Sequence, residues 1–116
     1  MFKVCKRMEI SGSHQLKLDY GSKCENLHGH NWIVKVYVCA EQLDKNGMVI
    51  DFTHIKRAIH DKLDHQHLNN VFLLNPTAEN IAYWIAQEVN LIRVGAHCYK
   101  VEIQESEGNL ATWELD

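Results

Sequence analysis

The sequence predicts one α+β domain in which a four-stranded antiparallel sheet carries two helices on one face. Two observations lead to this fold class. Apolar and polar residues alternate with a period of two in four segments, which lie at 2–10, 31–39, 99–105 and 110–115. Between the second and the third of these segments, apolar residues recur instead at helical spacing. The predicted order is therefore strand, strand, helix, helix, strand, strand (ββααββ).

Alternation predicts the first two strands. In residues 2–10 the apolar residues of one parity are Val4, Met8 and Ile10. The second strand, 31–39, is clearer, because one face carries only large apolar residues: Trp32, Val34, Val36 and Val38. A polar loop from Lys17 to Glu25 separates the two strands, with Gly21 near its centre.

Capping residues and apolar stripes predict the two helices. Asp51 can cap a helix whose apolar stripe is Phe52, Ile55, Ala58, Ile59 and Leu63. The segment Asn75-Pro76-Thr77 ends one element and begins the next. Thr77 is the expected N-cap of a second helix, whose apolar face is Ile81, Trp84, Ile85 and Val89.

Two further strands are predicted at the C-terminal end. Tyr99 to Glu105 alternates, as does Leu110 to Leu115, and Glu107-Gly108-Asn109 supplies the turn between them. A four-stranded antiparallel sheet has two open edges, and so short a chain offers little to cover them. Joining subunits edge to edge is a common solution, so we expect a homo-oligomer.

Composition narrows the class of protein. The 116 residues, 46% of them apolar, predict a single globular domain over 1–116. A formal net charge of −3 argues against a dedicated nucleic-acid binder. The sequence has no apolar run long enough to span a membrane, and its charged first residues do not resemble a signal peptide, so we expect a cytoplasmic protein. The four cysteines form no Cys-x-x-Cys pair and are expected to be thiols.

Histidine is the informative residue type, with eight in the chain. His28 and His30 flank Gly29 directly before the second strand, and residues two apart on an extended chain point to the same side. His14 ends the neighbouring strand in the inferred pairing. Three histidines with an open fourth position are typical of catalytic zinc. The alternative is a pair of surface or hydrogen-bonded histidines, because His-x-His alone is a short motif.

Cys24 and Glu25 precede the His-Gly-His motif within the same loop. Near a metal ion or a histidine, the Cys24 thiol would ionise more readily and could serve as a base or nucleophile. Glu25 could be a second, distinct base. The alternatives are a buried thiol and a solvated carboxylate.

Asp64, His65 and His67 follow the first predicted helix. A carboxylate beside a histidine can fix its tautomer and raise its basicity, which is the usual arrangement of an orienting group and a base. Adjacency in sequence does not establish contact, so polar residues at a helix end are an equally good interpretation.

Glu105 falls on the parity of the apolar residues of its strand, Tyr99, Val101 and Ile103. A carboxylate there lies either at the end of the sheet, where water reaches it, or opposite a partner. A ligand that presents two N–H donors would suit the second case.

Together these residues resemble the 6-pyruvoyl-tetrahydropterin synthase and 6-carboxy-tetrahydropterin synthase family. The matching blocks cover nearly the whole chain in order: Ile10-Ser11-Gly12-Ser13-His14, Cys24-Glu25-Asn26-Leu27-His28-Gly29-His30, Gly47-Met48-Val49-Ile50-Asp51-Phe52, Leu63-Asp64-His65, Leu68-Asn69, Asn75-Pro76-Thr77-Ala78-Glu79-Asn80 and Glu105. Two departures are Ile10 and Gly12, where the family often has Phe and Ala.

The resemblance implies the tunnelling fold, in which three ββααββ subunits close a barrel and two trimers stack into a hexamer with active sites between subunits. It implies that His14, His28 and His30 bind Zn²⁺. It further implies that Cys24 is the catalytic thiolate and that Asp64 with His65 forms the relay that assists it. Glu105 would bind the amino-pyrimidine edge of a pterin, and Thr77 would help to line the pterin pocket.

The implied reaction converts 7,8-dihydroneopterin triphosphate to 6-carboxy-tetrahydropterin with loss of acetaldehyde and triphosphate. The three residues between Cys24 and the His-Gly-His motif favour this queuosine-pathway activity over 6-pyruvoyl-tetrahydropterin synthase. Glu25 beside Cys24 resembles a dual motif that also cleaves dihydroneopterin to the 6-hydroxymethyl pterin of folate synthesis. For the triphosphate, Lys17 and Lys23 are the loop candidates.

Two alternatives from other classes follow from the same residues. One is a non-catalytic, zinc-stabilised oligomeric binding module, which would need a closed four-ligand site. The other is a zinc hydrolase with an activated water, which would need no pterin anchor at Glu105.

Overall fold

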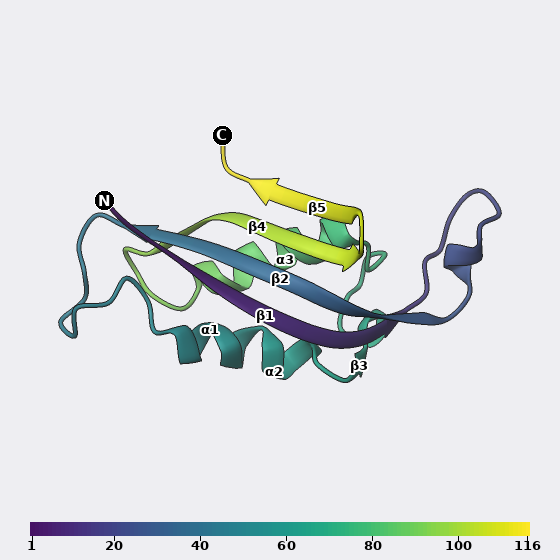
Figure 1. The fold of residues 1–116 in the computed structure, drawn as a ribbon, viewed down its shortest axis with the longest axis horizontal. Coiled ribbons are helices and arrows are strands. Elements are labelled where there is room, and N and C mark those ends of the chain that lie inside the picture. The colour runs from purple at the N-terminus through teal and green to yellow at the C-terminus, as the bar shows by residue number, and fades with distance from the viewer.

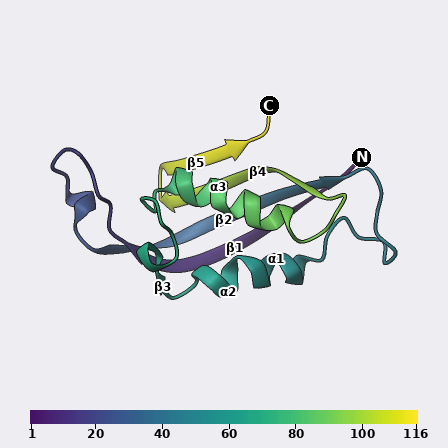
Figure 2. The same ribbon diagram turned by 180° about the vertical axis from the view of Figure 1, so that it is seen from behind.

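The computed structural model describes residues 1–116 as an elongated sheet with its helices on one face (Figures 1 and 2). The strands are β1 (Phe2–His14), β2 (His28–Ala40), β3 (Gln66–His67), β4 (His97–Ser106) and β5 (Asn109–Glu114). The helices are α1 (Phe52–Ala58), α2 (His60–Leu63) and α3 (Ala78–Asn90), with short 3₁₀ turns η1 (Lys23–Glu25) and η2 (Leu68–Asn70). The predicted α+β class is confirmed.

β1 and β2 form a hairpin that is longer than the sequence predicted at the end facing the loop. Their antiparallel register runs from Phe2 opposite Ala40 to His14 opposite His28. The alternation of apolar residues stops earlier because the last pairs are polar or glycine, although backbone pairing continues through them. This extension places His14 and His28 directly across from each other.

The sheet has five strands in the order β3-β1-β2-β4-β5, where the sequence predicted four. The four predicted strands are antiparallel neighbours, and the additional β3 pairs in parallel with β1 at Gly12 and Ser13. β3 is only two residues long, which is too short to show any periodicity. The sheet is therefore mixed rather than purely antiparallel.

The first predicted helix is divided into α1 and α2 at Ile59, whose φ and ψ of −114° and −65° depart from ideal helical values. The hydrogen bonds continue across the division, because Ile59 N–H donates to Ile55 O and Leu63 N–H donates to Ile59 O. Asp51 caps α1 as predicted, with its side chain accepting from Thr53 N–H.

Two bulges interrupt β4. Opposite β2, Cys98 pairs with Val38 and Lys100 with Tyr37, so Tyr99 is the extra residue. The Tyr99 ring lies 6.1 Å from the Tyr37 ring, on the face away from the helices. The predicted parity of Tyr99 is therefore wrong, and the fully buried Cys98 takes the core position instead.

The core lies between the sheet and the helices. Fully buried side chains come from β2, β4, α1 and α3, among them Val36, Val101, Ile55 and Ile85. The four cysteines are free thiols, as predicted. The structure contains no helix with the length and apolar character needed to span a bilayer.

Candidate metal centre and its surroundings

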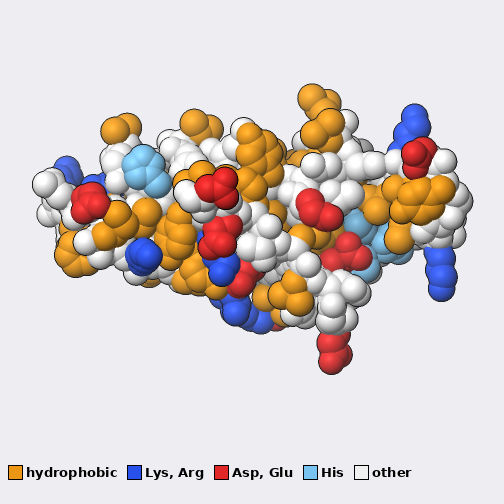
Figure 3. Space-filling model, turned by 90° about the horizontal axis from the view of Figure 1, so that it is seen from above, with side chains coloured by type: hydrophobic (Ala, Val, Ile, Leu, Met, Phe, Trp, Pro, Cys, Tyr) orange, Lys and Arg blue, Asp and Glu red, His pale blue; other side chains and the backbone are white.

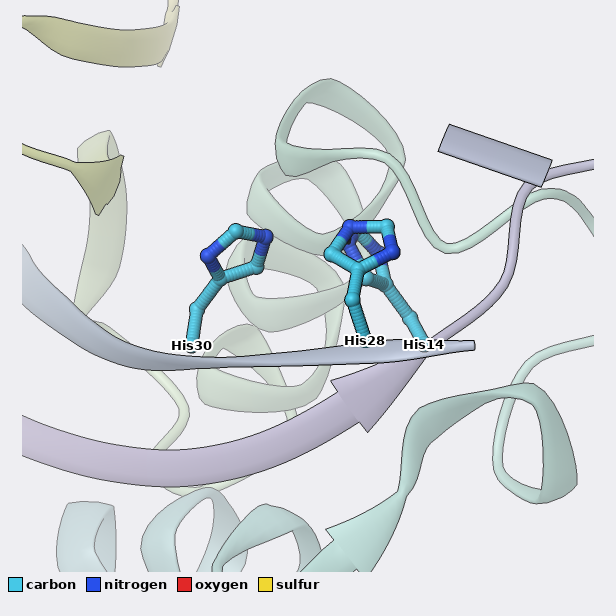
Figure 4. Close-up of side chains that lie close together, drawn as sticks. All are labelled: His14, His28 and His30. Atoms are coloured by element: carbon cyan, nitrogen blue, oxygen red, sulfur yellow. Dashed lines mark hydrogen bonds between the residues drawn. The ribbon is translucent and has the colours of Figure 1, made fainter. Parts of the chain in front are cut away.

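The three predicted histidines lie together on the helix-facing side of the sheet (Figure 4). His14 ends β1, and His28 and His30 begin β2, so the hairpin register itself brings them together. One ring nitrogen from each histidine lies within 4.8 Å of the others. His14 is fully buried, and the other two are partly buried.

Backbone carbonyls orient two of the three imidazoles. His14 Nδ1 lies 2.8 Å from Pro76 O, and His28 Nδ1 lies 2.7 Å from Asn26 O. Because a carbonyl oxygen can only accept, both Nδ1 atoms carry the proton and both Nε2 atoms present a lone pair. Such second partners are typical of metal-binding histidines.

The arrangement of the Nε2 atoms fits a cation. His14 Nε2 and His28 Nε2 are 2.8 Å apart, and two lone pairs facing each other at that distance repel unless a positive charge lies beside them. His30 Nε2 is buried and makes no hydrogen bond, although Glu105 Oε1 lies 3.3 Å away. Three neutral imidazoles that converge in this way are a donor set suited to a divalent transition metal.

Burial favours the neutral form of the ligands. The pKa of His14 is lowered, mainly by desolvation and further by His28, although the hydrogen bond with Pro76 raises it. The pKa of His30 is lowered mainly by desolvation, against an opposing effect of Glu105. Metal binding requires neutral imidazole. Because these two histidines are already mostly neutral near neutral pH, few protons have to leave them when a metal ion binds.

Trp32 and Gly12 form the wall behind the histidines. The Trp32 ring contacts His14 and His30 edge to face, with centroids 4.9 and 5.2 Å away. Its Nε1–H donates to Gly12 O at 3.1 Å. A Cβ at Gly12 would lie 3.2 to 3.3 Å from the side chain of Leu68, which gives a packing reason for glycine where the family often has alanine.

Glu105 lies next to the metal centre. It is the extra residue of the second β4 bulge, between the pairs that Gln104 and Ser106 make with β5. Its Oε1 is 3.3 Å from His30 Nε2, and the side chain is 28% exposed. A cavity of about 230 Å³ opens beside it. Glu105 is therefore at the end of the sheet and also directed toward a space that a ligand could fill.

Thr77 caps α3 as predicted, with its hydroxyl oxygen accepting from Asn80 N–H at 3.1 Å. The cavity beside Glu105 is lined by the next two residues, Ala78 and Glu79, and by residues 108–111. Thr77 itself is not among its lining residues. Its position beside Pro76 instead connects the helix cap to the carbonyl that orients His14.

Asp64 and His65 are in contact, as the arrangement of an orienting group and a base requires. His65 Nδ1–H donates to Asp64 Oδ2 at 2.8 Å, and Ser11 N–H donates to Asp64 Oδ1 at 2.9 Å. His65 N–H also donates to Ser11 O at 2.7 Å, and the His65 φ of 60° is left-handed. The pKa of Asp64 is lowered, first by the Ser11 N–H and then by His65 and His60.

His60 was not singled out by the sequence reasoning. Its Nε2 lies 3.6 Å from Asp64 Oδ2, so one carboxylate has two imidazole neighbours. The i, i+4 spacing of His60 and Asp64 at the end of a helix was the available signal. His67, the third histidine of the region, hydrogen-bonds through Nδ1 with Ser13 Oγ at 3.0 Å.

Cys24 and Glu25 lie in the exposed loop that carries η1. Glu25 borders a cavity of about 330 Å³ together with Gln15, Leu16, Lys17 and Asn69. Lys17 and Lys23 are exposed. Within one chain, the structure shows no contact of Cys24 or Glu25 with the metal centre or with the Asp64–His65 pair.

The fold and the three-histidine cluster define an α+β protein with a candidate metal centre at one end of its sheet. A family model described as 6-pyruvoyl tetrahydropterin synthase matches residues 3–116. The chain belongs to this family.

Curated relatives carry two different names. The 6-carboxy-5,6,7,8-tetrahydropterin synthase of Synechocystis sp. is 35% identical over 111 residues, which cover 87% of this chain and 85% of that protein. A dihydroneopterin monophosphate aldolase of Pyrococcus furiosus is 34% identical over 90 residues, covering 75% of this chain and 74% of that protein. Among solved structures, Caenorhabditis elegans 6-pyruvoyl tetrahydropterin synthase has a TM-score of 0.77 at 26% identity, covering 99% of this chain and 96% of that one. These relatives support a pterin-processing lyase with the tunnelling fold.

Proposed function

We propose that the chain is a zinc-dependent 6-carboxy-tetrahydropterin synthase. It would convert 7,8-dihydroneopterin triphosphate and water to 6-carboxy-5,6,7,8-tetrahydropterin, acetaldehyde and triphosphate, in the cytoplasm and on the route to queuosine. The observation that carries the proposal is the position of Glu105, 3.3 Å from His30, beside three converging imidazoles. A metal hydrolase would not need this carboxylate, whereas a pterin with two N–H donors on one edge does.

His14, His28 and His30 would hold the zinc ion and leave a coordination position open. When bound there, zinc supplies a Lewis acid that lowers the pKa of the vicinal hydroxyls of the substrate side chain. Glu105 accepts two hydrogen bonds from the pterin ring and so fixes the direction in which the side chain points. The cavity beside Glu105 offers room for the ring.

Cys24 and the Asp64–His65 pair would move protons on the substrate side chain. Asp64 accepts from His65 Nδ1–H, which leaves Nε2 free to take or give a proton. His65 is 82% exposed and makes no contact with Cys24 of its own chain. We propose that the two groups meet across a subunit boundary and that the active site is completed by a second copy of the chain.

A homo-oligomer also explains the unprotected β5 edge of the sheet. Exposed hydrophobic side chains lie on and near β5, among them Leu110, Leu115 and Tyr83. The view onto the β5 side shows hydrophobic atoms along much of this face (Figure 3). We propose a hexamer built as a dimer of trimers, in which this edge is paired with a neighbour.

A second activity is suggested by Glu25. Its carboxylate borders a cavity separate from the one beside Glu105, and the Pyrococcus furiosus relative is named an aldolase of dihydroneopterin monophosphate. We propose that Glu25 serves as the base in cleavage of the dihydroneopterin side chain to 6-hydroxymethyl-dihydropterin. Formation of 6-pyruvoyl-tetrahydropterin is the alternative product from the triphosphate substrate.

Product analysis tests these assignments. Zinc-loaded wild type, Cys24→Ala and Glu25→Ala are each incubated with dihydroneopterin and with its triphosphate, and pterins and acetaldehyde are identified by mass spectrometry. We expect the carboxypterin from the triphosphate with wild type and Glu25→Ala, but not with Cys24→Ala. Absence of turnover by the wild type would favour a zinc-stabilised binding module, and full activity of Glu25→Ala on dihydroneopterin would exclude Glu25 as the base of the second activity.

A further inference from the structure

From Ser11 to Lys17, every second residue pairs with the segment 64–75 along one edge of the backbone. Ser11 N–H and C=O pair with the Asp64 side chain and the His65 N–H, respectively. Ser13 pairs with His67 in β3. The spacing of two is that of a strand edge, although β1 itself ends at His14.

Beyond His14, two asparagine side chains take the place of a strand. Asn69 Oδ1 accepts from Gln15 N–H at 2.8 Å, and Asn69 Nδ2–H donates to Gln15 O at 2.7 Å. Asn75 does the same to Lys17, with distances of 2.8 and 2.6 Å. A carboxamide presents one donor and one acceptor in a plane, as a peptide group does, so each side chain completes both hydrogen bonds of one backbone residue.

The bound segment carries the loop with the two candidate bases. We call the paired hydrogen bonds of Asn69 with Gln15 and of Asn75 with Lys17 the asparagine clamps. Leu16, which lies between the two clamped residues, donates its N–H to Cys24 O at 2.9 Å. Leu18, directly after Lys17, donates its N–H to Glu25 Oε2 at 3.4 Å. The loop extends beyond the end of the sheet, where no helix covers it (Figure 1).

We propose that Asn69 and Asn75 are positioning residues that set the place of Cys24 and Glu25 relative to the metal centre. They act through the backbone of residues 15–18 rather than on the substrate. The inference rests on the proposed function only in taking Cys24 and Glu25 as reacting groups. Because His14, His28, His30 and Glu105 all lie outside residues 15–25, we expect loss of the Asn69 contacts to affect turnover more than zinc or pterin binding.

The experiment compares wild type, Asn69→Asp and Asn69→Ala as zinc-loaded, purified oligomers. Asn69→Asp keeps the size and one acceptor but replaces the donor facing Gln15 O by an oxygen. Asn46→Asp is the matched control, since Asn46 is exposed in the turn after β2, away from the loop. Hydrogen exchange is followed by mass spectrometry in peptides covering 15–25, together with zinc content, kcat and KM.

For both Asn69 variants we expect exchange in 15–25 to be faster by about tenfold, the effect of losing a pair of hydrogen bonds. We expect kcat to fall by a similar factor, with zinc content unchanged and KM little altered. Any one of three results would overturn the proposal. These are unchanged hydrogen exchange in 15–25, an unchanged kcat despite faster exchange, and loss of zinc together with the faster exchange. If the Asn69 variants do not fold, Asn75→Ala is compared by exchange and kcat alone, because Asn75 precedes Pro76, whose carbonyl orients His14.

The exchange measurement separates this proposal from the proposed function. If the wild type turns over no pterin, the proposed function fails, but the clamp is still tested by exchange and by the rate at which iodoacetamide alkylates Cys24. The clamp then requires both rates to change in Asn69→Asp and not in Asn46→Asp.

Discussion

Glu105 is the residue at which the metal centre and the proposed pterin site meet. Glu105→Gln keeps the shape of the side chain but removes the charge that favours two N–H donors. We expect kcat/KM to fall by about one to two orders of magnitude, the value of charged hydrogen bonds, while the zinc stoichiometry stays the same. Steady-state kinetics and metal analysis on one preparation check this. Full activity of the variant would show that the Glu105 carboxylate does not anchor the pterin ring.

Gly12 is the residue at which packing behind the histidines can be tested. In Gly12→Ala the new Cβ would lie 3.2 to 3.3 Å from Leu68, whose side chain is 1% exposed and has little room to move. We expect a loss of about 1 kcal/mol in the free energy of unfolding, as is usual for overpacking. Gly29→Ala is the control, because its Cβ meets nothing closer than 3.7 Å. Equal stability of the two variants in urea unfolding would contradict this account.

Asp64 gives a pH dependence with a defined sign. Its pKa is lowered from 3.8 in the folded chain, mainly by the Ser11 N–H. The stability that the ionised carboxylate contributes is therefore fully present above about pH 5 and is lost as pH falls through the lowered pKa. We expect metal-free wild type to be more stable than Asp64→Asn by a constant amount near neutral pH and by a shrinking amount below about pH 4. A difference that grows on acidification would show the opposite linkage.

At the scale of elements, the cap of α3 connects stability with the metal centre. Thr77→Ala removes the acceptor for Asn80 N–H, which we expect to cost about 1 kcal/mol of stability. Because Pro76 O orients His14, we also expect weaker zinc binding, measured by competition with a chelator. Thr77→Ser retains the hydroxyl and should behave like the wild type. A stability loss with unchanged zinc affinity would separate the cap from the metal centre.

The four long strands and the helices could be predicted because each repeats its pattern over several residues. The metal centre could be predicted in part: spacing put His28 and His30 on one side, and strand pairing brought His14 to them. The roles proposed for Cys24 and Glu105 came from the resemblance. The carbonyl partners at Pro76 and Asn26 could not be predicted, because every residue has a backbone carbonyl and the sequence carries no signal for its direction.

The elements that the sequence missed are those defined by one or two residues. β3 and the two β4 bulges depend on local register, which tertiary pairing decides. The bulge at Tyr99 reversed the parity inferred for that residue. The two asparagine clamps were visible only as parts of family motifs, because their backbone partners lie more than fifty positions away, with separations of 54 and 58 residues.

At the scale of the whole molecule, the separation of Cys24 from the Asp64–His65 pair within one chain leads to a prediction about assembly. Cys24 lies in the loop beyond the sheet, whereas Asp64 and His65 lie at the β1 edge and make no contact with it. If each active site combines Cys24 of one subunit with His65 of another, then Cys24→Ala and His65→Ala should each be inactive. Mixed oligomers of the two variants would nevertheless contain some sites in which both residues are intact.

For equal amounts of the two variants, random assembly leaves both residues intact in about a quarter of the sites, so about a quarter of the wild-type activity should return. The variants are mixed in denaturant, refolded with zinc and assayed with the pterin triphosphate, and native mass spectrometry verifies that mixed oligomers have formed. Refolded single variants provide the baseline. Mixed oligomers without recovered activity would place Cys24 and His65 of one site in the same chain, and the loop would then have to fold back to the β1 edge when substrate binds.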